Sequence, residues 1–451
     1  MSLYPQYPKY KSTPCPWLKD VPDHWSVKRI KNIATYNDEA LDEKTEPDLE
    51  IEYVDISSVT LTNGVEKSET MTFEKAPSRA RRKVKHGDVI VSTVRTYLKA
   101  IAPINNPPEN MIVSTGFAVV RPMDNLHSGF AGYLLQSNGF VGDVVANSVG
   151  VSYPAINASD LVRIPAVEPP ISEQESIARF LDYKTAQIDA LIAKKEALLT
   201  KLAEKRTAFI SHAVTKGLDP SVPMKDSGVE WQGEIPAHWK AKRLRFLTTM
   251  AGGMTPSTGT PEYWNGDIPW VSPKDMKRER LNGSIDNLTE KAVFETGIRL
   301  HESERILIVV RGMILAHTFP VAINTVPVTV NQDMKVLSTC LNHEYLAILL
   351  SGIQSLVLSI VQESAHGTKV LRTDMFRNIF LPVPPNEEQA KIVQEVHRFT
   401  VQIDEQKKAV QLVIDRLNEY RSALITNAVT GKIDVRNFNM QGSANMETVN
   451  V

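Results

Sequence analysis

Apolar residues recur at heptad spacing in two long stretches of the chain. Residues 173–216 and 387–430 contain no proline and no glycine, so each predicts one helix of about 40 residues, or about 60 Å. Steps of four and three residues from Ile177 and from Ile392 meet apolar side chains at seven of ten and nine of ten positions, which is typical of a coiled-coil seam. The expected seam residues are Ile177, Leu181, Ile188, Leu191, Leu198, Leu202 and Phe209 in the first helix and Ile392, Val396, Phe399, Ile403, Val410, Val413, Leu417 and Leu424 in the second.

A helix of this length needs a partner that buries its apolar stripe. We expect the two helices to pair antiparallel and to act as a rigid spacer. The alternative is that each helix packs separately on its own globular neighbour. The expected N-caps with capping-box partners are Ser172 with Glu175 and Asn386 with Gln389, and the expected stops are Gly217 and Gly431.

The segments before each helix alternate short apolar runs with turn residues. Such runs, punctuated by Gly, Pro and Asn, predict strands of a β-rich mixed domain. Short amphipathic helices are expected at 130–138 and 343–352, each followed by a glycine loop, "SVGVSYPAIN" or "SAHGTKVLRT". The expected strands lie within 51–61, 88–94, 111–120, 268–272, 305–315 and 320–330.

The two halves repeat at an offset of 214 or 215 positions. "PWLKDVPDHWSVKRI" (16–30) returns as "EWQGEIPAHWKAKRL" (230–244), and "EPPISEQESI" (168–177) as "VPPNEEQAKI" (383–392). "QID" and "AVT" marks recur inside the helices at the same offset, whereas the β-rich segments match poorly. The chain is therefore a tandem duplication with a common scaffold and two diverged globular domains.

These patterns predict an α/β protein of the α+β type, with two β-rich domains that alternate with two long antiparallel coiled-coil helices in a pseudo-twofold repeat. The expected boundaries are 1–164 and 221–381 for the domains, 165–220 and 382–435 for the helical spacers, and 436–451 for a flexible, polar tail.

Composition narrows the class of protein. The 451 residues are 42% hydrophobic and 23% charged, which is ordinary for a soluble globular protein. Two cysteines, Cys15 and Cys340, form no disulfide framework and suit a reducing, cytoplasmic location. No apolar run approaches the roughly 20 residues of a membrane span, and the N-terminal residues do not resemble a signal peptide.

The net charge of −1 does not indicate a nucleic-acid binder, so DNA binding must depend on local patches. "SRARRKVKH" (78–86) and "KDMKRER" (274–280) are dense in the cations that neutralise phosphates. The alternative is a solvated charged surface. The candidate DNA-contacting residues are Arg79, Arg81, Arg82 and Lys83; Arg95, Tyr97 and Lys99, expected on one face of an extended run; Lys274, Lys277 and Arg278; and Arg311, which nearly repeats Arg95.

The acidic stretch 37–52 would repel a duplex, and we expect it to face a partner protein. No catalytic motif is present. "NPPE" (106–109) lacks the aromatic residue of a methyltransferase tetrad, and "HGTKV" (366–370) is no phosphate loop. The ten His show no metal-ligand spacing, and the repeated His-Trp pair predicts packing. We therefore expect neither catalytic residues nor a metal site.

The Pro-x-His-Trp motifs, the Pro-Pro and Glu-Gln helix starts, and the "QID" and "AVT" marks occur twice in one order. Over residues 16–435 this pattern resembles the specificity subunits of type I restriction–modification systems. The resemblance implies that each β-rich domain reads one half of a split, asymmetric site in double-stranded DNA, with the helices fixing the gap. It also implies DNA contact by Ser152 and Tyr153 in the first domain and Thr368 and Lys369 in the second.

The same resemblance implies that two methyltransferase subunits dock on the helices and domain flanks, and that restriction/translocase subunits can join them. S-adenosylmethionine, ATP and Mg²⁺ would bind those partners, and this chain would be no enzyme by itself. One rival is an interaction scaffold with a helical spacer and no DNA role. The other is a stand-alone methyltransferase or nuclease, which the missing cofactor loop and metal ligands disfavour.

Overall fold

The computed structural model describes residues 4–364 and 366–438. Most of the expected tail, residues 439–451, lies outside them. The chain divides into two compact units. Unit 1 consists of the described residues up to Glu196 and from Gln411 onward, and unit 2 consists of Ala197–Val410. Each long helix contributes one part to each unit.

Unit 1 contains a four-stranded sheet in the order β11-β10-β13-β4 and a second sheet in the order β8-β5-β12-β9, in which β5 and β12 are parallel. The first sheet consists of β4 (Ala34–Tyr36), β10 (Val89–Ser92), β11 (Ile101–Pro103) and β13 (Phe117–Pro122), and the second of β5 (Glu50–Val54), β8 (Glu69–Thr72), β9 (Ala80–Lys83) and β12 (Met111–Ser114). Three strand pairs flank them: β1 (Tyr10–Ser12) with β2 (Asp20–Pro22), β3 (Ser26–Arg29) with β14 (Pro165–Glu168), and β6 (Val59–Thr60) with β7 (Gly64–Val65).

Unit 2 repeats this plan. Its larger sheet has the order β18-β25-β22-β23-β20, and its smaller sheet, β21-β19-β24, again contains a parallel pair. The strands are β18 (Thr248–Gly252), β19 (Trp264–Val271), β20 (Arg280–Leu281), β21 (Asp286–Leu288), β22 (Ile306–Val309), β23 (Val321–Asn324), β24 (Thr329–Val330) and β25 (Met334–Thr339). The flanking pairs are β15 (Met224–Asp226) with β16 (Glu234–Pro236), β17 (Lys240–Arg243) with β28 (Phe380–Val383), and β26 (Val361–Glu363) with β27 (Lys369–Leu371).

Helices follow the sheets in both units. The short helices are α1 (Ser128–Gln136), α2 (Asn138–Ala146) and α3 (Ala158–Leu161) in unit 1 and α5 (Glu290–Thr296), α6 (His343–Gly352), α7 (Gln354–Ser359) and α8 (Thr373–Asn378) in unit 2. The long helices are α4 (Ile171–Lys216) and α9 (Asn386–Val429). The predicted α+β fold, with two β-rich domains that each precede a long helix, is confirmed.

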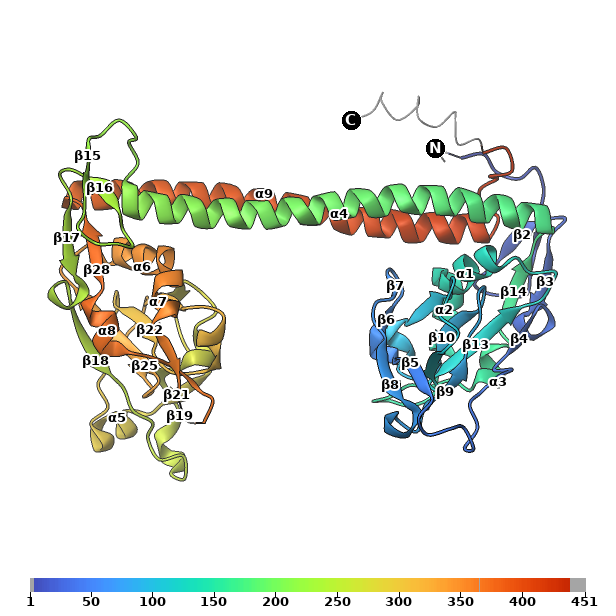
Figure 1. The fold of residues 1–451 in the computed structure, drawn as a ribbon, viewed down its shortest axis with the longest axis horizontal. Helices are drawn as coiled ribbons and strands as arrows, with labels where there is room; N and C mark the ends of the chain where they lie inside the picture. Colours follow the sequence, from blue (N-terminus) through green and yellow to red (C-terminus); the bar gives the residue numbers. More distant parts are fainter. Residues whose placement is uncertain (1–3, 365, 439–451) are drawn as a thin grey trace. The chain divides into compact units, whose positions relative to one another are not determined.

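The apolar run of β10 is buried on both faces because successive side chains point to opposite sides of the strand. Val89 and Val91 pack in one core with Phe130 and Leu134 of α1, whereas Ile90 belongs to the core on the other side. Figure 1 shows α1 and α2 between this sheet and α4. In unit 2 the buried run of β22 packs in the same core as Tyr345 and Leu349 of α6.

The long helices pair antiparallel within each unit. In unit 1 the Arg421 guanidinium donates to Asp189 at 2.9 Å, and Phe180 contacts Phe438 just beyond the end of α9. In unit 2 the rings of Phe209 and Phe399 stack at 3.9 Å. The helices also pack on the globular cores, so the expected helix pair and its alternative are both partly present.

The structure differs from the expected seam near the middle of the helices. Leu191, Leu198 and Val413 are exposed, whereas Ile414, one position on, is buried. A straight helix has 3.6 residues per turn, so a strict 3.5-residue ladder drifts off the contact face. The other expected seam residues are buried (Ile177, Leu181, Ile188, Leu202, Ile392, Val396, Ile403, Leu424) or half-buried (Phe209, Phe399, Val410, Leu417).

The expected N-caps are wrong, because the helices start at the double prolines. The amide of Gln174 donates to the carbonyl of Pro170 at 3.1 Å, and that of Gln389 to Pro385 at 3.0 Å. Ser172 therefore lies inside the first turn. A proline has no N–H to lose there, and its carbonyl is free to accept the first helical bond. The expected stops, Gly217 and Gly431, have φ of 83° and 74° just after each helix.

The repeated motifs contact one another. In unit 1, Glu173 at the start of α4 accepts from the Trp25 indole at 3.0 Å and lies 2.7 Å from His24 Nε2. In unit 2, His238 Nε2 lies 2.7 Å from Glu388. We call each His–Glu contact, with the tryptophan beside it, the clamp of its unit. It ties the first motif of each half to the start of the helix that follows.

Candidate nucleic-acid interface

Two loops meet at the end of β10 in unit 1. Val94 pairs with Ala155, and Ala155 also pairs with Val149, so residues 93–99 lie against residues 148–155. The hydroxyls of Thr96 and Ser148 lie 2.8 Å apart. We call these two segments tip 1. It unites candidates from separate parts of the sequence, namely Arg95, Tyr97, Lys99, Ser152 and Tyr153.

Arg95 contacts an aromatic ring across tip 1. Its guanidinium lies 4.8 Å from the centre of the Tyr153 ring, a cation–π distance. Arg95 and Lys99 both have positive φ, 49° and 54°, on either side of a 3-10 turn at Thr96–Leu98. The predicted extended run is therefore wrong: the buried Thr96 side chain anchors a tight turn. The turn still leaves Arg95, Tyr97 and Lys99 exposed.

Tip 1 also exposes apolar residues that the sequence did not single out. Val151 is fully exposed, Val149 is 80% exposed, and Leu98 is 50% exposed, beside Tyr153 at 65%. An apolar side chain in a strand-like pattern predicts burial, so the sequence carried no signal for these three. Exposed apolar residues gathered on one loop pair are typical of a binding surface.

The matching place in unit 2 has the same construction. After β22, Arg311 pairs with Val370, and the amide of Gly312 donates to the carbonyl of Lys369 at 2.9 Å. We call residues 310–316, 361–364 and 366–371 tip 2. It contains the candidates Arg311, Thr368 and Lys369. Sequence positions that nearly repeat, Arg95 and Arg311, thus occupy equivalent turns.

The chemistry of tip 2 is more polar. The Lys369 ammonium lies 2.5 Å from Glu363, and this hydrogen bond lowers the pKa of the Glu363 carboxyl. Arg311 is exposed and Thr368 half-buried. Met313 is the exposed apolar side chain of this tip.

The basic stretch 78–86 is partly neutralised inside unit 1. Arg79 lies 2.9 Å from Asp55, Arg81 lies over the Phe73 ring, and Arg82 is half-buried. Lys83 is exposed. The Arg79 carbonyl accepts from the amide of Thr115. The carbonyl of the next residue, Gly116, accepts from the amide of Thr93 in tip 1. The stretch therefore borders tip 1 through its first arginine.

The second basic stretch, 274–280, borders no part of tip 2 through a described hydrogen bond. Lys274 lies 2.5 Å from Asp286, which raises the pKa of the lysine. Lys277 and Arg278 are exposed.

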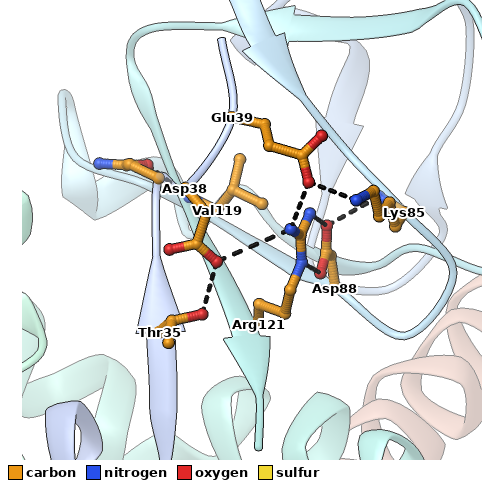
Figure 2. A network of polar contacts seen from close by, with 8 residues as sticks. Thr35, Asp38, Glu39, Lys85, Asp88, Val119 and Arg121 are labelled. Carbon is orange, nitrogen blue, oxygen red and sulfur yellow. Dashed lines mark hydrogen bonds and ion pairs between the residues drawn. The ribbon is translucent and has the colours of Figure 1, made fainter.

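Part of the acidic stretch 37–52 is used within unit 1. Figure 2 shows the Arg121 guanidinium among the carboxylates of Asp38, Glu39 and Asp88. Arg121 makes two 2.8 Å bonds to the buried Asp88. Glu39 bonds Lys85 and Arg121, which lowers the pKa of its carboxyl. Charges that the sequence presented as an acidic surface are here paired with cations.

Among the described side chains, no three His, Cys, Asp or Glu lie close enough together to hold a metal ion. Within residues 4–364 and 366–438, no helix combines the length and apolar character that crossing a membrane requires.

The family model "Type I restriction modification DNA specificity domain" matches residues 22–201 and 236–412. The chain belongs to this family. The first matched specificity domain contains all of tip 1 and the second contains tip 2, so both tips lie within the matched segments.

Known members and structures support this assignment. The chain is 30% identical over 247 residues to the Escherichia coli type I restriction enzyme EcoR124I/EcoR124II specificity subunit, covering 53% of this chain and 55% of that protein. It is 31% identical over 188 residues to the MjaIX specificity subunit of Methanocaldococcus jannaschii, covering 40% and 42%. The chain thus spans about half the length of these curated relatives.

A solved structure supports the fold. A chain from work described as "Structural basis underlying complex assembly and conformational transition of the type I R-M system" superposes with a TM-score of 0.71. It is 20% identical and covers 91% of this chain and 98% of that one. At this identity the likeness establishes the fold of the specificity family.

Proposed function

We propose that this chain is the non-catalytic DNA-specificity subunit of a type I restriction–modification complex. Unit 1 would bind one half of a split, asymmetric target in double-stranded DNA through tip 1, and unit 2 would bind the other half through tip 2. The helix pair would set the separation of the two half-sites. Half-sites on one face of B-DNA lie about 34 Å apart for each helical turn between them.

The observation that carries this proposal is the contrast between scaffold and tips. Both units repeat one sheet plan and place an exposed arginine, Arg95 or Arg311, on the turn after an equivalent strand. The side chains around the two arginines differ. A common frame with two different contact surfaces fits a target whose halves have different sequences.

The arginines suit two roles in this interface. A guanidinium can neutralise a phosphate or bond guanine through two donors in the major groove. The hydroxyls of Tyr97, Ser152, Tyr153 and Thr368 would add neutral hydrogen bonds to bases or phosphates. The exposed Lys83, Lys277 and Arg278 would contribute phosphate contacts outside the tips.

The partners follow from membership in the family. Two methyltransferase subunits would dock on the helices and domain flanks, and restriction/translocase subunits would join them. S-adenosylmethionine, ATP and Mg²⁺ would bind those partners. The complex would act in the cytoplasm, where the two cysteines, which are unpaired in the structure, stay reduced.

The test is methylome sequencing of a host that lacks such a system. The methyltransferase encoded next to this chain's gene is expressed there alone or together with this chain. We expect a split motif that is methylated only when the chain is present. Identical methylomes, together with failure of the chain to co-purify with the methyltransferase, would contradict the proposal and favour the interaction scaffold.

A further inference from the structure

We propose that tip 1 recognises thymine through its C5-methyl group, with Val149 and Val151 as the contacting side chains. This inference rests on the proposed function and adds the chemical class of base that one half of the target must contain.

Exposure and position single out the two valines. Val151 is fully exposed and Val149 80% exposed, on the loop that also presents Ser152 and Tyr153. Apolar surface in water is unfavourable, and burying one methyl-sized group on binding contributes roughly a fourfold gain in affinity. Leu98, on the facing turn, is a further exposed apolar residue of tip 1.

The loop that carries the two valines is fixed at Val149 before any ligand binds. The amide of Val149 donates to the Ala155 carbonyl at 2.8 Å, and the amide of Ala155 donates back to Val149 at 3.0 Å. Gly150, between the valines, has a φ of 115°, which favours glycine and turns the chain sharply. Valine has few side-chain rotamers. Little conformational entropy is therefore lost when these side chains meet a base.

The charge of tip 1 favours DNA as the occupant. Arg95 and Lys99 are exposed, and segments 93–99 and 148–155 contain no Asp or Glu. An apolar surface edged by cations and free of carboxylates complements methyl groups that lie between rows of phosphates. The thymine methyl is the apolar group that base pairs present in the major groove. Side chains that wedge between bases from the minor groove are mostly larger, such as Phe, Leu or Met.

Tip 2 offers a contrast within the same chain. Its exposed or half-buried residues include Arg311, Glu363, Thr368 and Lys369, whose side-chain types can form hydrogen bonds with base edges. Met313 is its exposed apolar residue. We therefore expect methyl recognition to be stronger in the half-site bound by unit 1.

The experiment uses the full chain in complex with its methyltransferase and a duplex carrying the motif found by methylome sequencing. Thymine is replaced by uracil, which lacks only the methyl group, in one half-site at a time. We expect the dissociation constant to rise about fourfold per contacted methyl in one half-site. In the double variant Val149→Ser/Val151→Ser the uracil effect in that half-site should disappear.

The control variant is Met123→Ser, which changes an exposed apolar residue just after β13. The start of β13, Phe117, pairs with Ser92 at the end of β10 that leads into tip 1, so Met123 lies at the opposite end of the strand. It should keep the uracil effect. Target-specific binding that is insensitive to uracil in both halves would overturn the thymine inference and leave the proposed function standing. An unchanged uracil effect in the valine variant would also overturn it. Failure to distinguish the target from random DNA would instead overturn the proposed function.

Discussion

The Nε2 atom of His24 lies 2.7 Å from Oε1 of Glu173, which joins the first motif of the repeat to the start of α4. His238 and Glu388 make the same 2.7 Å contact at the start of α9. The beginning and the end of each β-rich domain are thereby tied together. This contact explains why the His-Trp and Glu-Gln motifs recur while the sequence between them diverges.

The two clamps differ in how many donors they satisfy. Glu173 accepts from His24, from Trp25 at 3.0 Å and from the Tyr7 hydroxyl at 3.1 Å. Glu388 makes its side-chain contact with His238. We expect Glu173→Gln to lower the free energy of unfolding of unit 1 by about 2 kcal/mol. The matched Glu388→Gln should cost unit 2 about 1 kcal/mol or less, since that carboxylate is more exposed. Hydrogen exchange resolved by unit measures both, and equal losses would contradict this difference.

The seam prediction centres on Ile403, which is buried in α9. Ile403→Asp would place a charge among apolar side chains, so we expect a loss of about 3 kcal/mol or more and weaker assembly with the methyltransferase. Val401, two positions earlier, is exposed. Val401→Asp should therefore leave urea unfolding within about 1 kcal/mol of the wild type. Normal melting and assembly of the Ile403 variant would refute the paired-helix arrangement.

The tips are expected to set the salt dependence of DNA binding. If Arg95 and Arg311 each neutralise one phosphate, Arg95→Ala and Arg311→Ala should each reduce the slope of log K against log salt by about 0.9. A variant of either arginine with an unchanged slope but relaxed sequence preference would indicate base contact instead. Lys31→Ala, which removes an exposed charge beside the far end of β13, provides the control and should change neither quantity.

His301 makes the stability of unit 2 depend on pH. Burial, and then the charges of Arg299 and Arg305, lower the pKa of His301 from 6.5 to about 4. Between pH 6.5 and about 4, His301 is therefore protonated in the unfolded chain and neutral in the folded chain. The contribution of the neutral histidine is complete above pH 6.5 and is lost as the pH falls towards 4, by roughly 3 kcal/mol. In His301→Gln, the free energy of unfolding should change less with pH over this range. Urea unfolding measured at several pH values from about 7 to about 4.5 tests this, and the same pH dependence in the variant and the wild type would contradict the assignment.

Much of the architecture was predictable from local patterns. The long helices α4 and α9 follow from heptad spacing without proline or glycine, and β10 and β22 follow from apolar runs bounded by turn residues. The helix caps were less predictable. Both Ser172 and Pro170 are compatible with a helix start. Which of them becomes the N-cap depends on the position of the end of the preceding strand, β14.

The sequence by itself determined the tandem plan, because periodicity, turn residues and repeated motifs are properties of neighbouring positions. Only the tertiary structure decided which distant residues meet. It placed Arg95 over Tyr153, paired the acidic Glu39 with Arg121, and left Val149 and Val151 in solvent. The physical reason is that the exposure and partners of a side chain depend on what the rest of the chain packs around it. A valine has the same chemistry in a core and on a binding surface.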